Sequence, residues 1–260
     1  MTLQPSSRSF ASFSLLSFDI YGTLIDWESG IFNIVSASPF FSSLPSSNAL
    51  ASRAGLLEAF NKQEAQIQSA HPEWLYSDVL AAAFKNLVKE HDLKADNDLE
   101  SEAKKFGESA GDWPAFPDTV EALKRLKKHY KLVPLSNVDN ASVARSVKGS
   151  FQGFQFDAIY TAQDIGSYKP DPNNFKYLLS HVKEEFGVEK SKVLHVAQSL
   201  FHDHVQASDF GIENVWVDRK GIMGDVPQEL KEKAIFGWRV ESLKELADLV
   251  DEAWAKAGGK

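Results

Sequence analysis

Cysteine is absent from this chain of 260 residues, which excludes disulfide bonds, thiolate metal sites and cysteine nucleophiles. The GxGxxG and P-loop patterns are also absent, so the sequence does not indicate nucleotide binding by either route. No apolar run is long enough to span a membrane. The net charge is -8, without a basic stripe, so we expect no nucleic-acid partner. From this composition we expect a cytoplasmic protein with neither a membrane nor a nucleic acid as partner.

The composition, 43% hydrophobic and 25% charged, suits one globular domain with an insertion or two modest domains. The first dozen residues, MTLQPSSRSFAS, are rich in serine and contain one arginine and no acid. We expect them to form a mobile tail, with an organelle transit peptide as the alternative.

The most informative stretch is SLLSFDIYGTLID, residues 14–26. Its apolar run from Leu15 to Phe18 is typical of a buried strand, and it ends at a carboxylate, Asp19. Gly22 allows a tight turn, and we expect the Thr23 hydroxyl to fold back and orient Asp19. A carboxylate at the end of a central strand can act as a nucleophile. The alternative is a strand that simply ends in an Asx turn.

Residues 28–112 show helical spacing without any strand pattern. Three helices are expected, over residues 50–70, 76–91 and 99–108, and the first carries Leu57, Phe60, Glu64 and Ile67 on one face. Residues 36–49 are expected to form a loop. Such a helical insertion beside a catalytic strand end could serve as a lid that lines a pocket, or could be a decoration that never moves.

Strands and helices alternate after residue 113. Strands are expected over 132–135, 158–160, 193–197 and 214–217. Asp118 and Glu121 resemble a capping box, Asp171 is expected to cap the next helix, and Gly187 to end it. The pattern predicts a three-layer α/β fold with a parallel sheet, made of residues 1–27 and 113–260, and an inserted all-helical cap over 28–112.

Four strand ends carry polar groups, and a parallel sheet brings them to the same edge. Ser136 and Asn137 can donate hydrogen bonds to an anionic substrate or an oxyanion. Lys169 would keep Asp19 ionised, with a depressed pKa. Asp203, which has no lysine beside it in the sequence, could direct water. Each residue alone also has a structural interpretation as a surface lysine, a turn or a helix cap. Their combination favours a catalytic site.

These segments resemble the motifs of the haloacid dehalogenase superfamily: FDIYGTLID, LSN, YKPDP and VAQSLFHDH, spanning residues 18–204. Within it the chain is most similar to type II L-2-haloacid dehalogenases. Tyr21 stands where the superfamily's phosphatases have a second Asp that protonates the leaving group. Gln198 stands where its magnesium enzymes have an Asp. The resemblance therefore implies a metal-independent hydrolase without a cofactor.

Some positions depart from that pattern. Where the dehalogenases have a substrate-clamping arginine on the first cap helix, this chain has Asn61, with Lys62 beside it and Arg53 a little earlier. Phe175 stands where a tyrosine is frequent, and His202 precedes Asp203 where a bulky aromatic residue is common. These changes leave the nucleophile in place and the substrate open.

The resemblance implies that Asp19 displaces halide from a 2-haloacid, forming an aspartyl ester that water hydrolyses to a 2-hydroxy acid. The alternatives are opening of a small epoxy acid, with His202 or Tyr21 as proton donor, a magnesium-dependent phosphatase, and a non-enzymatic binding protein. We expect a small anionic substrate and leave a homodimer open. The expected catalytic residues are Asp19, Thr23, Ser136, Asn137, Lys169 and Asp203. The expected substrate-binding residues are Tyr21, Arg53, Asn61, Asn137, Gln198, Ser199 and His202.

Overall fold

A parallel sheet organises the protein, for which a computed structural model describes residues 2–219 and 232–258. Within those residues six strands follow the order β4-β3-β2-β5-β6-β8, and every neighbouring pair is parallel. The predicted parallel α/β architecture is therefore confirmed. The strands are β2 (Leu15–Phe18), β3 (Lys131–Ser136), β4 (Tyr160–Thr161), β5 (Val193–Ala197), β6 (Glu213–Val217) and β8 (Trp238–Val240).

Strand β2 lies in the middle of the sheet, between β3 and β5. Leu15 is in register with Lys131 on one side and with Val193 on the other. From β2 the chain proceeds outward through β3 and β4, then crosses to β5 on the opposite side. The strand order thus reverses between β2 and β5, the point at which open α/β sheets bind ligands beyond the carboxyl ends of their strands.

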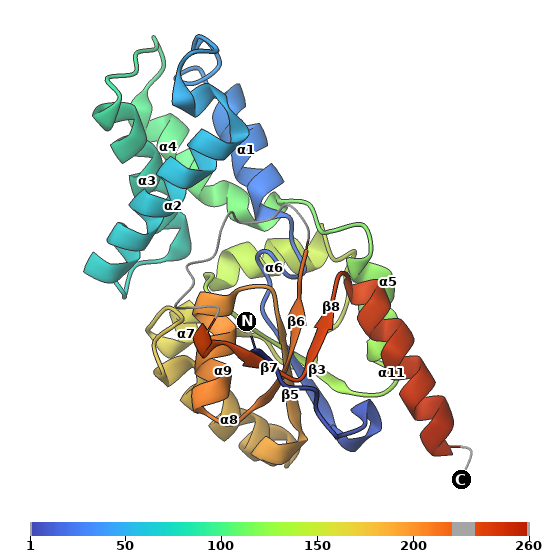
Figure 1. The fold of residues 1–260 in the computed structure, drawn as a ribbon. Coiled ribbons are helices and arrows are strands. Elements are labelled where there is room, and N and C mark those ends of the chain that lie inside the picture. Colours follow the sequence, from blue (N-terminus) through green and yellow to red (C-terminus); the bar gives the residue numbers. More distant parts are fainter. Residues whose placement is uncertain (1, 220–231, 259–260) are drawn as a thin grey trace.

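Helices cover both faces of the sheet and give the predicted three layers (Figure 1). One buried cluster joins the sheet to α5 (Thr119–Leu126), α6 (Asn140–Lys148) and α11 (Leu243–Gly258). The other joins it to α8 (Asn173–Phe186) and α9 (Val205–Asp209). A short helix, α7 (Ala162–Ile165), follows β4. Gly187, at φ +66°, ends α8 as expected, because its left-handed conformation suits glycine.

A group of helices stands above the sheet in Figure 1: α1 (Trp27–Ala37), α2 (Arg53–Ala70), α3 (Tyr76–Glu90) and α4 (Leu99–Gly107). A short 3-10 turn, η2 (Ala49–Ala51), precedes α2. Another, η3 (Glu108–Asp112), follows α4. The last three helices match the expected ranges closely, whereas α1 was not foreseen. No helix in the described ranges is both long and apolar enough to cross a membrane.

Aromatic packing joins these helices to the rest of the molecule. The rings of Phe60 and Phe84 each lie 5.7 Å from that of Phe106. Gly30 of α1 lies directly against the buried Trp113, so close that a Cβ there would come within 2.3 Å of the indole. One continuous apolar cluster therefore runs from the helical group to one face of the sheet.

The amino-terminal segment is docked onto the rest of the protein, partly through a separate two-stranded sheet, and the expectation of a mobile tail is wrong. Strand β1 (Thr2–Leu3) pairs with β7 (Ile235–Phe236), and a 3-10 turn, η1, spans Phe10–Ser12. Phe10 is buried, with its ring 4.7 Å from that of Trp238. Tyr130 donates a hydrogen bond to the Phe10 carbonyl at 2.9 Å. These contacts come from distant segments, so local composition could not reveal them.

Asp118 does not form the expected capping box on α5, where no side-chain cap is present. Its Oδ2 accepts the backbone N–H groups of Leu243 and Lys244 at 2.7 and 3.2 Å, at the start of α11. Its Oδ1 accepts from Arg219 Nη1 at 3.1 Å, and Arg219 Nε donates to the Thr23 carbonyl at 2.9 Å. Asp118 thus links the carboxyl-terminal helix to the turn after β2.

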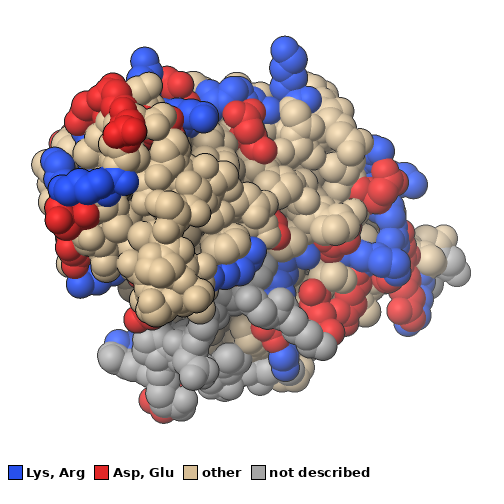
Figure 2. Space-filling view, turned by 90° about the horizontal axis from the view of Figure 1, so that it is seen from above, with Lys and Arg blue, Asp and Glu red and all other residues tan. Residues whose placement is uncertain are grey.

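Charges of both signs alternate on the face that carries the helical group. Seen from above, Lys and Arg side chains are interspersed with Asp and Glu around a broad uncharged area (Figure 2). Among the described residues, this face has no extended basic surface.

Candidate active site

The carboxylate at the end of β2 is held in one orientation. Asp19 is 6% exposed, and its Oδ2 accepts a hydrogen bond from Thr23 Oγ1 at 2.8 Å. Gln198 N donates to the same Thr23 oxygen at 2.9 Å, so the end of β5 fixes the turn after β2. Gly22 has φ +92°, which few other residues adopt. The Thr23 hydroxyl therefore lies where we expected it, folded back onto Asp19.

Lys169 places a buried ammonium group between two carboxylates. Its Nζ donates to Asp19 Oδ1 at 2.9 Å, to Asp203 Oδ1 at 2.7 Å and to the Leu135 carbonyl at 3.0 Å. These acceptors match the three donors of an ammonium group. The Asn137 amide holds the Lys169 backbone, donating to its carbonyl at 3.0 Å and accepting its N–H at 2.6 Å. The Asn137 side chain therefore positions Lys169, which was not its expected use.

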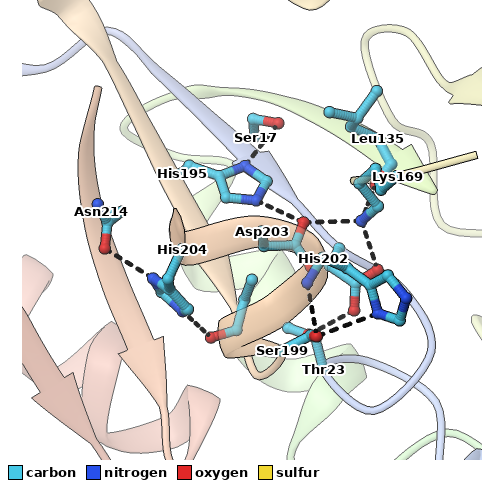
Figure 3. A network of polar contacts seen from close by, with 12 residues as sticks. Ser17, Thr23, Leu135, Lys169, His195, Ser199, His202, Asp203, His204 and Asn214 are labelled. Carbon is cyan, nitrogen blue, oxygen red and sulfur yellow. Dashed lines mark hydrogen bonds and ion pairs between the residues drawn. The ribbon is translucent and has the colours of Figure 1, made fainter. Parts of the chain in front are cut away.

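His195 belongs to this network and was not foreseen. It lies within β5 at 0% exposure, with Nε2 2.9 Å from Asp203 Oδ1 and Nδ1 3.2 Å from Ser17 Oγ (Figure 3). Phe175 packs against its ring at 5.0 Å. The signal in the sequence was a single titratable residue inside an otherwise apolar strand, two positions before its end.

Burial and ion pairing affect the two carboxylates differently. Burial raises the pKa of Asp19 above its ordinary value, and Lys169 offsets this only in part. Burial acts likewise on Asp203, but Lys169 and His195 outweigh it and hold the Asp203 pKa well below its usual range. The expected depressed pKa of Asp19 is therefore wrong. The two carboxylates share the ammonium group, but only Asp203 also has His195 as a partner.

A cavity of about 260 Å³ opens above these groups, a size suited to a small molecule. Its floor contains Asp19, Lys169 and Asp203, and Ser136, whose buried Oγ has no hydrogen-bond partner among the described residues. The remaining lining residues are Tyr21, Trp27, Asn61, Glu64, Ala65, Gln68, Tyr76, Asn137, Gln198, Ser199, Phe201 and His202.

Helix α2 supplies the opposite wall, which differs from the one expected. Of the three cap residues considered as an anion clamp, only Asn61 lines the cavity. Arg53 is 42% exposed and bonds Ser29 Oγ at 3.2 Å, close to Glu28 at 3.4 Å. Lys62 is exposed and does not line the cavity. The structure therefore places Arg53 and Lys62 outside the site, and puts Glu64 and Gln68 on this wall.

Two other expected site residues make internal contacts. Tyr21 donates a hydrogen bond to the Ala110 carbonyl at 3.2 Å, and burial raises its pKa. Ser199 Oγ accepts the His202 N–H at 3.1 Å and lies 3.1 Å from its Nδ1. Burial lowers the pKa of His202 to about 4, so this imidazole is neutral near pH 7.

A family model for haloacid dehalogenase-like hydrolases matches residues 13–197, a range that contains Asp19, Lys169 and His195. The chain belongs to this family. It is 31% identical over 144 residues to (S)-2-haloacid dehalogenase 4A of Burkholderia cepacia, covering 55% of this chain and 58% of that relative. It is 26% identical over 218 residues to (S)-2-haloacid dehalogenase H-109 of Pseudomonas putida, covering 80% and 87%.

Solved structures of dehalogenases share the fold of this family member. The L-2-haloacid dehalogenase of Xanthobacter autotrophicus matches with a TM-score of 0.73 and 19% identity, covering 92% of this chain and 98% of that one. A defluorinating L-2-haloacid dehalogenase matches with a TM-score of 0.75 and 18% identity, covering 94% and 98%. At these identities the likeness establishes the fold.

The magnesium ion of the superfamily's metal enzymes does not fit the donors of this haloacid dehalogenase-like chain. Hard divalent cations need several carboxylate or carbonyl oxygens. Here Lys169 Nζ bonds both Asp19 and Asp203, so an ammonium already bridges the two carboxylates. Gln198 and Tyr21 add no carboxylate. Within the described residues, no group of three or more His, Cys, Asp or Glu side chains could hold a metal ion.

Proposed function

We propose that this chain hydrolyses a carbon–halogen bond at C2 of a small 2-halocarboxylate, with Asp19 as a covalent nucleophile and without a metal ion. The observation that carries the proposal is the clamping of Asp19 at the cavity floor, by Thr23 on one oxygen and Lys169 on the other. A carboxylate fixed in this way is preorganised for attack on a small substrate. Its dehalogenase relatives support the same reaction class.

In the first step an oxygen of Asp19 forms a bond to C2, and halide leaves with the electron pair of the broken carbon–halogen bond. Ser136 Oγ, buried at the floor without a partner among the described residues, is suited to donate to the substrate carboxylate. Lys169 remains beside Asp19 and balances the negative charge of the floor. Halide needs no proton, so no general acid is required.

In the second step water attacks the carboxyl carbon of the Asp19 ester, releasing a 2-hydroxy acid inverted at C2. Asp203 is suited to direct this water, because its buried Oδ2 has no partner among the described residues while Oδ1 is held by Lys169 and His195. Lys169 also lies where negative charge develops on the ester oxygen.

Opening of an epoxy acid is the weaker candidate because it needs a proton donor for the alkoxide. The Tyr21 hydroxyl already donates to the Ala110 carbonyl and is harder to deprotonate than usual. His202, with its pKa lowered to about 4, carries no second proton near neutral pH. Both donors considered for that reaction are thus poorly suited to it.

A single turnover in heavy-oxygen water, with enzyme in excess and a 2-haloacid as substrate, tests the mechanism. We expect the label in the peptide that contains Asp19 and unlabelled oxygen in the new hydroxyl group. Label in the product alone would show that Asp19 acts only as a base. The same assay with a strong chelator tests whether the reaction proceeds without a metal ion. Halide release should persist. Loss of activity that magnesium restores would contradict metal independence.

A further inference from the structure

The cavity has an acidic wall at the place where a clamp for an anion was expected. Glu64 lines it from α2, together with Asn61 and Gln68. Among the described lining residues the only Lys or Arg is Lys169, against three carboxylic acids. Lys169 bonds two of those acids and the Leu135 carbonyl, so its three donors are already used. A second anionic group on the substrate would meet repulsion at this wall.

Glu64 is held so that its carboxyl group stays on the cavity side. Gln68 Nε2 donates to Glu64 Oε1 at 3.3 Å, and the nearby Tyr76 hydroxyl lowers the pKa of the same carboxyl group in part. Burial raises the pKa of Glu64 to about 7, because the wall gives the charged form little compensation. A buried carboxylate that lacks a cation is costly, and a cationic ligand would relieve that cost.

Aromatic rings also line this cavity. Tyr76, whose hydroxyl influences the Glu64 carboxyl group, lies with its ring centroid 5.9 Å from that of Tyr21, and Trp27 and Phe201 line the cavity too. The faces of aromatic rings attract ammonium groups, and the attraction grows when water is excluded. A carboxyl group among aromatic rings is an arrangement that selects an ammonium group over a carboxylate or an alkyl group.

We propose that the natural substrate carries an ammonium group at the end remote from its reacting carbon, and that Glu64 binds this group. The inference rests on the proposed function for the other end, where Ser136 would hold the carboxylate. The substrate class is therefore an ω-amino-2-halocarboxylate, a zwitterion whose negative end faces the floor and whose positive end faces α2. This charge pattern explains the loss of a basic clamp from the first cap helix.

The binding test uses halogen-free analogues, so it does not depend on dehalogenation. The ω-amino acids from 3-aminopropanoate to 6-aminohexanoate are each compared by titration calorimetry with the plain carboxylate of equal chain length. We expect at least one amino acid to bind about tenfold or more tightly than its partner, as a charge-assisted hydrogen bond allows. At pH 6 its binding should also release protons, because the ammonium group favours ionised Glu64.

Glu64→Gln keeps the size of the side chain and removes its charge. In this variant the preference and the proton release should both disappear. Glu58→Gln is the matched control, since Glu58 lies on the exposed side of the same helix and does not line the cavity. Equal binding of the two series, no measurable binding of any amino acid, or equal behaviour of the two variants would overturn the proposal.

The halogenated counterparts separate this inference from the proposed function. Halide release with a preference for the amino series supports both. A preference in binding without halide release from any substrate would contradict the dehalogenase function and leave the ammonium site standing. Halide release at equal rates from both series would support the dehalogenase function and contradict the ammonium site.

Discussion

The floor and the wall of the cavity are built in different ways. On the floor, Lys169 joins three groups, from β3 and from the segments after β2 and β5, and its partners Asp19 and Asp203 have side chains at most 8% exposed. On the wall, Asn61, Glu64 and Gln68 all project from one helix, where Gln68 donates a hydrogen bond to Glu64 at 3.3 Å. The floor is cross-linked by a buried ion-pair network, whereas the wall depends on side chains of one helix. Under the proposals above, the reaction chemistry would lie on the floor and substrate choice on the wall.

Removal of the Lys169 ammonium group should lower both the stability of the protein and its turnover. Lys169→Met leaves Asp19 and Asp203 buried together without a counter-ion, which should lower the free energy of unfolding by about 3–5 kcal/mol. Turnover should fall on the order of 10³-fold, because the charge that stabilises the ester oxygen is lost. Urea denaturation and halide release measure the two effects, with the exposed Lys176→Met as control. A folded variant with a near-native rate would make Lys169 merely structural.

His195 should have a smaller effect, acting through Asp203. His195→Phe removes one donor from Asp203 Oδ1 and should cost about 1–3 kcal/mol of stability. Ester hydrolysis should slow about tenfold, so that kcat and KM fall together, kcat/KM stays unchanged and the Asp19 ester accumulates in quenched-flow experiments. His195→Gln, which retains a donor, should recover part of the rate. His181→Phe, on the outer side of α8, is the control. Unchanged kcat would mean that Asp203 needs no support from β5.

Glu64, on the wall, should make the stability of the protein depend on pH. Glu64 has its pKa raised from 4.5 to about 7 in the folded protein, which therefore holds a proton that the unfolded chain has lost between these values. The free energy of unfolding is therefore highest below pH 4.5, as far as Glu64 affects it, and falls as the pH rises to about 7. Because the side chain is partly open to the cavity, the change should be on the order of 1–2 kcal/mol. Glu64→Gln should flatten this slope and Glu58→Gln should not; parallel slopes in both would refute the assignment.

The smallest expected effect distinguishes the residues of α2 from one another. Asn61→Ala should raise KM severalfold, about the worth of one hydrogen bond, with little change in kcat. Arg53→Ala should leave KM unchanged, because its guanidinium bonds Ser29 outside the cavity. Steady-state kinetics of the two variants is the measurement. A larger effect from Arg53 would mean that this helix moves when the substrate binds.

The sequence was sufficient for the floor because the floor is built from strand ends. The apolar runs before Asp19 and Gln198 could be recognised locally, and parallel strands must place their ends at one edge. Thr23 was found in the same way, since it bonds a residue only four positions away. The parallel direction of β2, β3 and β5 follows from the same alternation of strands and helices, whereas their order in the sheet came from the structure.

The features that could not be predicted depend on distant partners. His195 seemed an ordinary strand residue until Asp203 was placed beside it. Asp118 has the local spacing of a capping box, but its oxygens instead accept hydrogen bonds from the start of α11 and from Arg219. The orientation of Glu64 was equally hidden: it lay on the same helical face as Leu57 and Phe60, and only the position of α2 above the sheet turned it toward the cavity.

The contacts of Asp118 have a consequence for folding during translation. Asp19 is translated well before the residues that hold its supporting turn: the Thr23 carbonyl accepts from Arg219, Arg219 donates to Asp118, and Asp118 also accepts the backbone N–H of Leu243. This series of contacts can therefore be completed only after Leu243 has been translated. Until then a nascent chain can contain the segments of β2 and the helical group while the turn beside Asp19 lacks this support.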